Sequence, residues 1–365
     1  MAQNFQDTIA AASLTLTTNR VYDSAAGLAR LWQRGTDFLG CDYAVMCGAM
    51  SWVSERNLVS AISNAGGFGV IACGAMTPEL LAAEIAATQA QTKRPFGVNL
   101  ILLHPKLDEL LEVCKSSGVK TVVLAGAIPA KETVLSLKSA GIKVLGFAPT
   151  AQIGKKLVRI GIDGLIIEGS EAGGHIGPVS TSVLAQEILP EITEVPVFVA
   201  GGIGRGETIV SYLQMGAAGV QLGTRFVCAT ESIAHPNFKR SFINAKARDA
   251  MASVQLDPQF SVHPVRALVN RATQEFLAVQ ASAVADFKAG RLSLYDAQQR
   301  IEHFWAGALR RAVIDGDVET GSLMAGQSVG MVTCEQSSRE ILNQLVAQAE
   351  SYLQCLYSSD EELFP

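Results

Sequence analysis

The sequence predicts an α/β fold, a closed (βα)8 TIM barrel with a small helical domain inserted after the eighth strand. From residue 43 onward, eight short apolar runs alternate with stretches that have the spacing of amphipathic helices. Each run is apolar throughout, which is typical of parallel strands buried on both faces. Successive runs begin 21 to 32 residues apart, which leaves room for one strand and one helix. An open, doubly wound sheet is the alternative, although such a sheet usually has fewer strands.

The predicted strands follow one another along the chain, and the stretches between them have helix-end signals. The strands are Tyr43–Cys47, Phe68–Cys73, Phe96–Leu102, Thr121–Ala125, Lys143–Ala148, Gly164–Glu168, Pro196–Ala200 and Gly219–Phe226. The first helix, Ser54–Ala65, opens on a capping serine and ends before a glycine pair. The second begins at Thr77-Pro78, with proline in its first turn. Later helices are predicted at His104–Ser117, Pro129–Ala140, Ala151–Ile160 and Thr208–Met215.

Four segments make up the predicted domain organisation. Residues 1–35 form an N-terminal extension, in which Leu28–Arg34 is expected to be a helix that plugs the bottom of the barrel. Residues 36–228 form the barrel, and residues 229–319 are too long for a bare loop and rich in helix formers. We therefore expect residues 229–319 to be a small helical domain that covers one face. Residues 320–365 are expected to return to the barrel as a glycine-rich loop and a terminal helix.

Composition excludes several classes of protein. Hydrophobic residues make up 48% of the chain, which excludes a disordered protein. The net charge is −5 and no basic block occurs, so no nucleic-acid partner is expected. No apolar run is long enough for a membrane span, and the N-terminus does not resemble a secretory signal. Seven scattered cysteines without a CxxC pair, and five histidines without HxxxH spacing, predict no metal site and a cytoplasmic location.

Glycine gathers where the last two barrel strands end. Residues 200–204 read AGGIG and residues 222–224 read LGT. Loops of this kind turn backbone N–H groups toward an anion, and many TIM barrels hold a phosphate after strands 7 and 8. The sequence therefore predicts a phosphate site here. The alternative is that the glycines only make tight turns.

Three polar residues stand at the same predicted face. His175 lies in a glycine-rich loop beyond the sixth strand, and its imidazole can donate or accept a proton near neutral pH. Glu168 ends that strand and can bind a hydroxyl, act as a base or merely cap a turn. Asn99 interrupts an apolar strand, and its amide suits the edge of a heterocycle or a hydrogen bond to a neighbouring loop.

The remaining histidines and two cysteines are interpreted as structural. His104 and His303 fall in helical stretches, whereas His235 and His263 precede proline and are expected to shape turns, although either could face the site. The cysteines, Cys47 and Cys73, end strands and have no basic neighbour in the sequence, so they are interpreted as small core residues.

Several motifs together resemble one enzyme superfamily. They are CGAMSWVSERNLVSAISNAGGFGVIACG, KRPFGVNLILL, EGSEAGGHIG, VPVFVAGGIGRGE, MGAAGVQLGTRF and SLMAGQSVG. In order and spacing, from about residue 36 to 350, they resemble the FMN-dependent enoyl-acyl-carrier-protein reductase II and nitronate monooxygenase (2-nitropropane dioxygenase-like) superfamily. The sequence of the covering segment is more similar to the reductase branch.

The resemblance implies one FMN per chain and a set of residues around it. Its contacts with the flavin ring would be Gly48, Ala49, Met50 and Asn99, with Glu168 near the ribityl chain. Its phosphate side would be Gly173, Gly174, Gly201, Gly202, Gly223 and Thr224. A returning loop of Met324, Ala325, Gly326 and Gln327 would reach the flavin. His175 matches the active-site histidine of the superfamily. Ala49 departs from the glycine usual in these reductases, which puts that contact in doubt.

Three functional hypotheses follow. In the preferred one, the enzyme uses NAD(P)H as co-substrate to reduce the 2,3-double bond of an enoyl thioester, as in fatty acid synthesis. The resemblance also implies a homodimer. In the second, a nitronate monooxygenase oxidises alkyl nitronates with O2. In the third, the barrel binds a phosphate ligand without turnover. The resemblance also implies help from a monovalent cation, for which the sequence shows no site.

Overall fold

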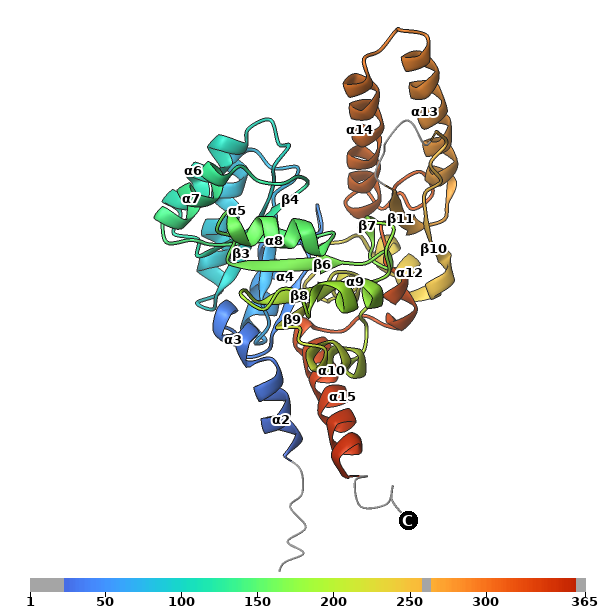
Figure 1. Ribbon diagram of the computed structural model, residues 1–365. Coiled ribbons are helices and arrows are strands. Elements are labelled where there is room, and N and C mark those ends of the chain that lie inside the picture. Colours follow the sequence, from blue (N-terminus) through green and yellow to red (C-terminus); the bar gives the residue numbers. More distant parts are fainter. Residues whose placement is uncertain (1–22, 258–263, 359–365) are drawn as a thin grey trace, which may run out of the picture.

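The computed structural model describes residues 23–257 and 264–358, and its centre is a parallel barrel (Figure 1). The barrel strands are β1 Val45–Cys47, β2 Gly69–Ala72, β3 Phe96–Ile101, β4 Thr121–Ala125, β5 Lys143–Phe147, β6 Gly164–Glu168, β8 Val197–Ala200 and β9 Gly219–Leu222. Each lies within one of the eight predicted runs, so the predicted fold class is confirmed. The prediction of a strand over Gly219–Phe226 is wrong in its second half, because Gly223 leaves the sheet and Thr224–Val227 form the short helix α11.

The barrel closes between β1 and β2, where the strand pairing is shortest. Seven of the neighbouring strand pairs form parallel ladders in the order β1-β9-β8-β6-β5-β4-β3-β2. Between β1 and β2 the contact is a single parallel bridge, Met46 to Phe68. Two backbone hydrogen bonds hold it, from Cys47 N to Phe68 O and from Phe68 N to Val45 O, each 2.9 Å. The closed sheet leaves no edge among these strands, which excludes the doubly wound alternative.

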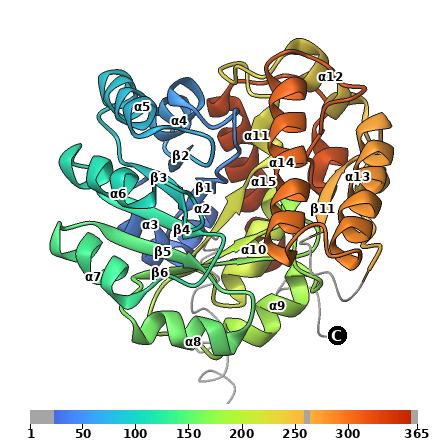
Figure 2. The ribbon, with the colours of Figure 1, turned by 90° about the horizontal axis from the view of Figure 1, so that it is seen from above.

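In the described part of the chain, seven helices connect successive barrel strands and lie around the barrel (Figure 2). They are α4 Arg56–Asn64, α5 Pro78–Gln91, α6 Leu107–Ser116, α7 Lys131–Ser139, α8 Ala151–Arg159, α9 Thr181–Ile188 and α10 Gly206–Gln214. The prediction that Ser54 caps the first helix is wrong, because the cap is the carboxylate of Glu55, which accepts from Asn57 N and Leu58 N. His104 also lies outside a helix, in the turn before α6, where its Nδ1 accepts from Lys106 N at 3.1 Å.

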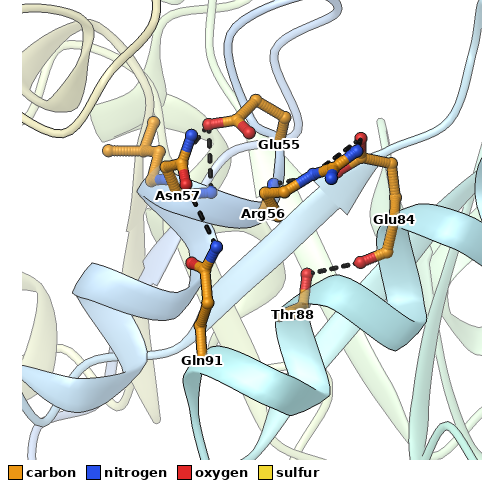
Figure 3. Close-up of polar contacts among 7 residues, drawn as sticks. Glu55, Arg56, Asn57, Glu84, Thr88 and Gln91 are labelled. Atoms are coloured by element: carbon orange, nitrogen blue, oxygen red, sulfur yellow. Dashed lines mark hydrogen bonds and ion pairs between the residues drawn. The ribbon is translucent and has the colours of Figure 1, made fainter.

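Polar contacts hold α4 against α5 (Figure 3). The Arg56 guanidinium pairs with the buried carboxylate of Glu84, which is 6% exposed. At the C-terminal end of α5, Gln91 Nε2 donates to Asn57 Oδ1 in the first turn of α4 at 3.2 Å. A buried carboxylate needs a partner of this kind, because an uncompensated charge is costly to desolvate. The pair therefore fixes the first helix that follows the β1 loop.

Two N-terminal helices, α2 Ser24–Leu31 and α3 Gln33–Leu39, precede the barrel. The predicted single helix over Leu28–Arg34 is wrong, since the chain breaks at Trp32 between the two. The plug is instead α3, whose Phe38 and Leu39 pack into the apolar cluster inside the barrel. Helix α2 packs outside, against the terminal helix α15 Ser338–Ser358 (Figure 1).

The segment after the eighth barrel strand contains helices and, in addition, two strands. Its elements are α12 Pro236–Asn244, the 3-10 turn Ala247–Asp249, β10 Ala250–Ala252, β11 Val265–Leu268, α13 Arg271–Lys288 and α14 Leu294–Val313. Helices α13 and α14 form a hairpin that rises above the barrel (Figure 1) around a core of Phe276, Ile301 and Trp305. Strand β11 pairs with β10 and with β7, the two-residue strand Gly174–His175 of the β6 loop. We refer to residues 229–319 as the covering unit.

The close packing of α3 predicts opposite effects for the same substitution at two helical glycines. A methyl group on Gly35 would lie 2.0 Å from the carbonyl oxygen of Ala218, whereas one on the exposed Gly307 in α14 would have no neighbour nearer than 3.8 Å. We expect Gly35→Ala to lower the free energy of unfolding by about 1–3 kcal/mol. Gly307→Ala should raise it by about 0.5–1 kcal/mol, because alanine favours the helix. Urea unfolding of both variants checks this, and equal effects would contradict it.

Candidate active site

The barrel interior is apolar at one end and polar at the other. Its apolar floor includes Met46, Phe68, Val123, Leu145, Ile166 and Phe198. Side chains alternate along a strand, so Asn99, Glu168 and Gln221 share the inward-facing register and lie toward the carboxyl ends of their strands. In TIM barrels this end carries the chemistry. The polar layer therefore marks the candidate site.

Two buried amides belong to this layer. Asn99 is 5% exposed and its Nδ2 donates to the carbonyl of Val123 at 3.2 Å, which fixes the side chain. Gln221 is 7% exposed, and a methyl group on Gly48 would lie 3.7 Å from its amide nitrogen. Sequence reasoning missed Gln221, although the signal that identified Asn99, a polar residue inside an apolar strand, was equally present in GVQL.

Glu168 and His175 lie near each other at this end of the barrel. Burial raises the pKa of Glu168 to about 7, and the nearby His175 acts in the opposite direction. The carboxyl group is therefore poised to exchange a proton near neutral pH. His175 itself is exposed, on β7, and follows Gly174, whose φ of +80° lies in the left-handed region.

Gly48, Ala49 and Met50 form a loop that is fixed from within. Ser54 Oγ donates to the carbonyl of Gly48 at 3.0 Å and accepts from Met50 N at 3.1 Å. Ala49 packs on the interior apolar cluster, and Met50 approaches Gly223. Trp52 follows with φ of +68°, the one left-handed residue other than glycine in the described part of the chain. A conformation this rare for a bulky side chain is strained and must be held by its surroundings.

The two glycine loops after β8 and β9 lie side by side, since Ala200 pairs with Gln221. Gly201 and Gly202 have φ of +99° and +70°, conformations that favour glycine. Within the described residues, no protein acceptor is recorded for the backbone N–H groups of Gly202, Gly223 and Thr224. Backbone donors without an acceptor at adjacent strand ends can together bind an anion.

The chain returns to this face after the covering unit. Gly326 N donates to Thr224 Oγ1 at 2.9 Å, and Gln327 N donates to the carbonyl of Glu171 at 2.9 Å. A methyl group on Gly173 would lie 2.5 Å from Gly326 N, so these two backbones touch. Met324 lies beside Gly174, and the adjoining Ala325 is fully buried. The structure thus brings together the candidate residues of the β6, β9 and returning loops.

The other sequence-identified groups have structural positions. His235 caps α12 through its Nδ1, His303 is exposed on α14, and His263 lies outside the described residues. Burial raises the pKa of the Cys47 and Cys73 thiols to about 12, so neither is a thiolate at neutral pH. In residues 23–257 and 264–358, no group of three or more His, Cys, Asp or Glu side chains is placed to hold a metal. None of the described helices has both the length and the apolar character to cross a membrane.

Comparison with known proteins supplies the family. The nitronate monooxygenase family model matches residues 33–117 and 106–348. The chain belongs to the nitronate monooxygenase family. It is therefore an enzyme of the oxidoreductase type, which disfavours the hypothesis of a binding barrel without turnover.

The similarity to known relatives and solved structures extends over most of this chain. The (3aS,4S,5R,7aS)-5-hydroxy-7a-methyl-1-oxo-octahydro-1H-indene-4-carboxyl-CoA dehydrogenase of Mycobacterium tuberculosis is 31% identical, over 87% of this chain and 96% of that protein. A solved FabK structure from Thermotoga maritima is 33% identical with a TM-score of 0.79, covering 89% of this chain and 98% of that one. A nitroalkane oxidase from Streptomyces ansochromogenes is 26% identical with a TM-score of 0.72, covering 88% and 99%.

The raised pKa of Glu168 predicts a pH-dependent stability. Between its ordinary value of 4.5 and about 7, the folded chain keeps a proton that the unfolded chain releases. This contribution to stability is therefore present at low pH and lost as the pH rises through about 7. Glu168→Gln cannot ionise, so we expect it to exceed the unmodified chain in stability by about 1–3 kcal/mol at pH 8 and by much less at pH 5.

Urea unfolding of the cofactor-free chain at both pH values measures this difference. The exposed Glu132→Gln in α7 is the matched control and should show no such change. A stability gain for Glu168→Gln that is equal at pH 5 and pH 8 would show that Glu168 ionises normally.

Proposed function

We propose that this chain binds FMN across the mouth of the barrel and uses NAD(P)H to reduce the 2,3-double bond of an enoyl thioester, as an enoyl-acyl-carrier-protein reductase of type II does. The observation that carries the proposal is that the Gly202 and Gly223 backbone N–H groups, which have no acceptor among the described residues, converge on one face with the neighbouring Glu168 and His175. An anion cradle beside a proton-exchanging pair fits a phosphate-bearing cofactor and a reaction that needs a proton.

The residues present fit FMN. The N–H groups of Gly202, Gly223 and Thr224 would hold its phosphate, and Glu168 would accept from a ribityl hydroxyl. Asn99 and Gln221 would face the polar edge of the ring system, and Ala49 and the apolar floor would support its plane. Glu171 is a carboxylate beside Gly202, but its Oε2 already accepts from Thr181 N at 2.8 Å and from Thr181 Oγ1 at 3.0 Å.

In this proposal the chain's residues orient the substrate and move one proton. When bound, FMN would supply the redox chemistry that links NAD(P)H to reduction of the thioester at its β-carbon. His175 gives the proton to the α-carbon, and Glu168 beside it holds a proton near neutral pH. The apolar floor keeps water from the reacting face.

Similarity favours a thioester substrate. FabK is an enoyl-acyl-carrier-protein reductase II, and the Mycobacterium tuberculosis relative is named as a carboxyl-CoA dehydrogenase. The second candidate function, oxidation of alkyl nitronates with O2, has its own support in the family model and in the "Probable nitronate monooxygenase" of Staphylococcus haemolyticus, 26% identical over 87% of this chain. In that reaction His175 would act as a base toward a neutral nitroalkane.

Absorbance of the purified protein tests the proposal. A flavin band between 350 and 500 nm, bleached anaerobically by NADH or NADPH and restored by a crotonyl thioester, is the expected result. A flavin that both nucleotides leave oxidised would contradict the reductase. Bleaching by propyl-2-nitronate without any nucleotide would favour the second candidate function.

Two substitutions at Gly202 of the same size, one charged and one neutral, test the proposed phosphate site. Gly202→Asp adds a carboxylate beside the proposed phosphate, whereas Gly202→Asn adds a side chain of the same size without charge. Both must adopt the φ of +70°, which Asn and Asp tolerate better than most residues. Like charges about 4 Å apart cost on the order of 1–4 kcal/mol, so FMN should bind Gly202→Asp roughly 10- to 1,000-fold more weakly than Gly202→Asn. Equal FMN affinity in titrations would place the phosphate elsewhere.

The role of His175 is tested by separating the two half-reactions. His175→Ala should keep its flavin, because the proposed phosphate contacts lie on other loops. Turnover should fall by about 10²- to 10⁴-fold, the usual contribution of a positioned acid or base. Flavin reduction by NADH should fall much less than enoyl reduction. His303→Ala on α14 is the control, and unchanged turnover in a fully flavinated His175→Ala would remove the histidine from the mechanism.

A further inference from the structure

Among the described strands, the one that carries His175 pairs with the covering unit and not with the barrel. β7 is two residues long, and its ladder is with β11 of the covering unit, where His175 pairs with Val265 and Gly174 with Arg266. Beyond the strand, Ile176 N donates to the carbonyl of Pro264 at 2.9 Å. A two-residue strand has too few hydrogen bonds to hold its own conformation. The place of the His175 backbone therefore depends on β11.

The side chain of Arg266 reaches back from β11 to the base of the same loop. Its Nε donates to the carbonyl of Ser170 at 2.9 Å, and one terminal nitrogen donates to the carbonyl of Ala250 at 2.6 Å. The guanidinium is half-buried, and burial lowers the pKa of Arg266 while the nearby Glu171 raises it. A charged group is thus held between two backbone carbonyls, in a setting where such hydrogen bonds are strong.

The backbone of Arg266 also contacts the returning loop. Its carbonyl accepts from Ala325 N at 3.3 Å, and the adjacent Ala267 forms a bridge with Met324. β7 and β11 lie side by side at the base of the hairpin of α13 and α14 (Figure 1). Arg266 therefore meets the His175 loop at two points, through its ladder with Gly174 and through Ser170, and it meets the Met324 loop at a third.

We propose that Arg266 is a positioning residue, which fixes the loop of residues 169–177 so that His175 stands at the reacting face. The inference rests on the proposed function only for the role of His175. Lysine cannot replace it, because a single ammonium lacks the planar fork that binds two carbonyls in fixed directions. Since misplacement by about 1 Å can cost roughly 100-fold in rate, the effect of removing the fork should be large.

Turnover of three variants tests the proposal. Arg266→Met keeps the apolar stem and removes the fork, and Arg266→Lys keeps the charge. Arg300→Met, on α14 and paired with Asp286, is the control outside the site. We expect about a 10- to 100-fold fall in kcat for Arg266→Met and Arg266→Lys, little change in KM and unchanged flavin reduction by NADH. Arg300→Met should keep full turnover. An unchanged kcat in Arg266→Lys would overturn the claim that the planar guanidinium is required.

Combination with His175→Ala distinguishes positioning from a separate contribution. If Arg266 acts through His175, adding Arg266→Met to His175→Ala should reduce kcat by less than about twofold further. Effects that multiply in the double variant would overturn the proposal.

Hydrogen–deuterium exchange gives a readout that does not depend on the reaction. In the flavinated enzyme, amides of residues 170–176 should exchange at least tenfold faster in Arg266→Met and Arg266→Lys, while α13 and α14 stay as protected as in Arg300→Met. Unchanged exchange of residues 170–176 would overturn the proposal whatever the substrate. Faster exchange in an enzyme with no NAD(P)H-driven turnover would uphold the positioning and contradict only the proposed function. Faster exchange throughout α13 and α14 in both Arg266 variants would show a purely structural role and overturn it.

Discussion

The candidate site depends on one backbone contact that only glycine permits. Gly173 and Gly326 come so close that a methyl group on the first would lie 2.5 Å from the amide nitrogen of the second. This contact brings the returning loop onto the β6 loop, and Thr224 and Glu171 then fix it by hydrogen bonds to the amides of Gly326 and Gln327. Strand ends alone would give an open barrel mouth. Through this contact, a chain segment about 150 residues away in the sequence lines the site together with the loops of β6 and β9.

The barrel could be predicted because its signals are local. A strand buried on both faces is apolar throughout, so each of the eight runs was visible by itself. The errors lie where a local signal was ambiguous. Ser54 and Glu55 can both cap a helix, and the glutamate does so because the serine hydroxyl is used by the β1 loop. The eighth run continues as an apolar sequence past Gly223, and only the fold shows that the chain turns there.

The parts of the site that could not be predicted depend on distant pairing. β7 and β11 have two and four residues, too few to show a period, and they are joined across about 90 residues of chain. Arg266 therefore had no sequence signal that linked it to His175. Gln221 is a different case. Like Asn99, it is a polar residue inside an apolar strand, so the same sequence signal predicts both. The candidate residues on the barrel strands and their loops converge on one face, because those strands end at the same edge, whereas Met324–Gln327 reach it through the returning loop.

The barrel and the covering unit contribute different parts of the candidate site. The glycine loops after β8 and β9 belong to the barrel, whereas the partner of the His175 strand and the Arg310 guanidinium, 5.8 Å from the Trp52 ring, belong to the covering unit. Substitutions in β11 or α14 would therefore act first on the His175 loop and on the contact with Trp52. Relatives with differently named activities share this fold at 26–33% identity. In this chain the covering unit therefore contributes the strand that pairs with the His175 strand, and the barrel contributes the glycine loops.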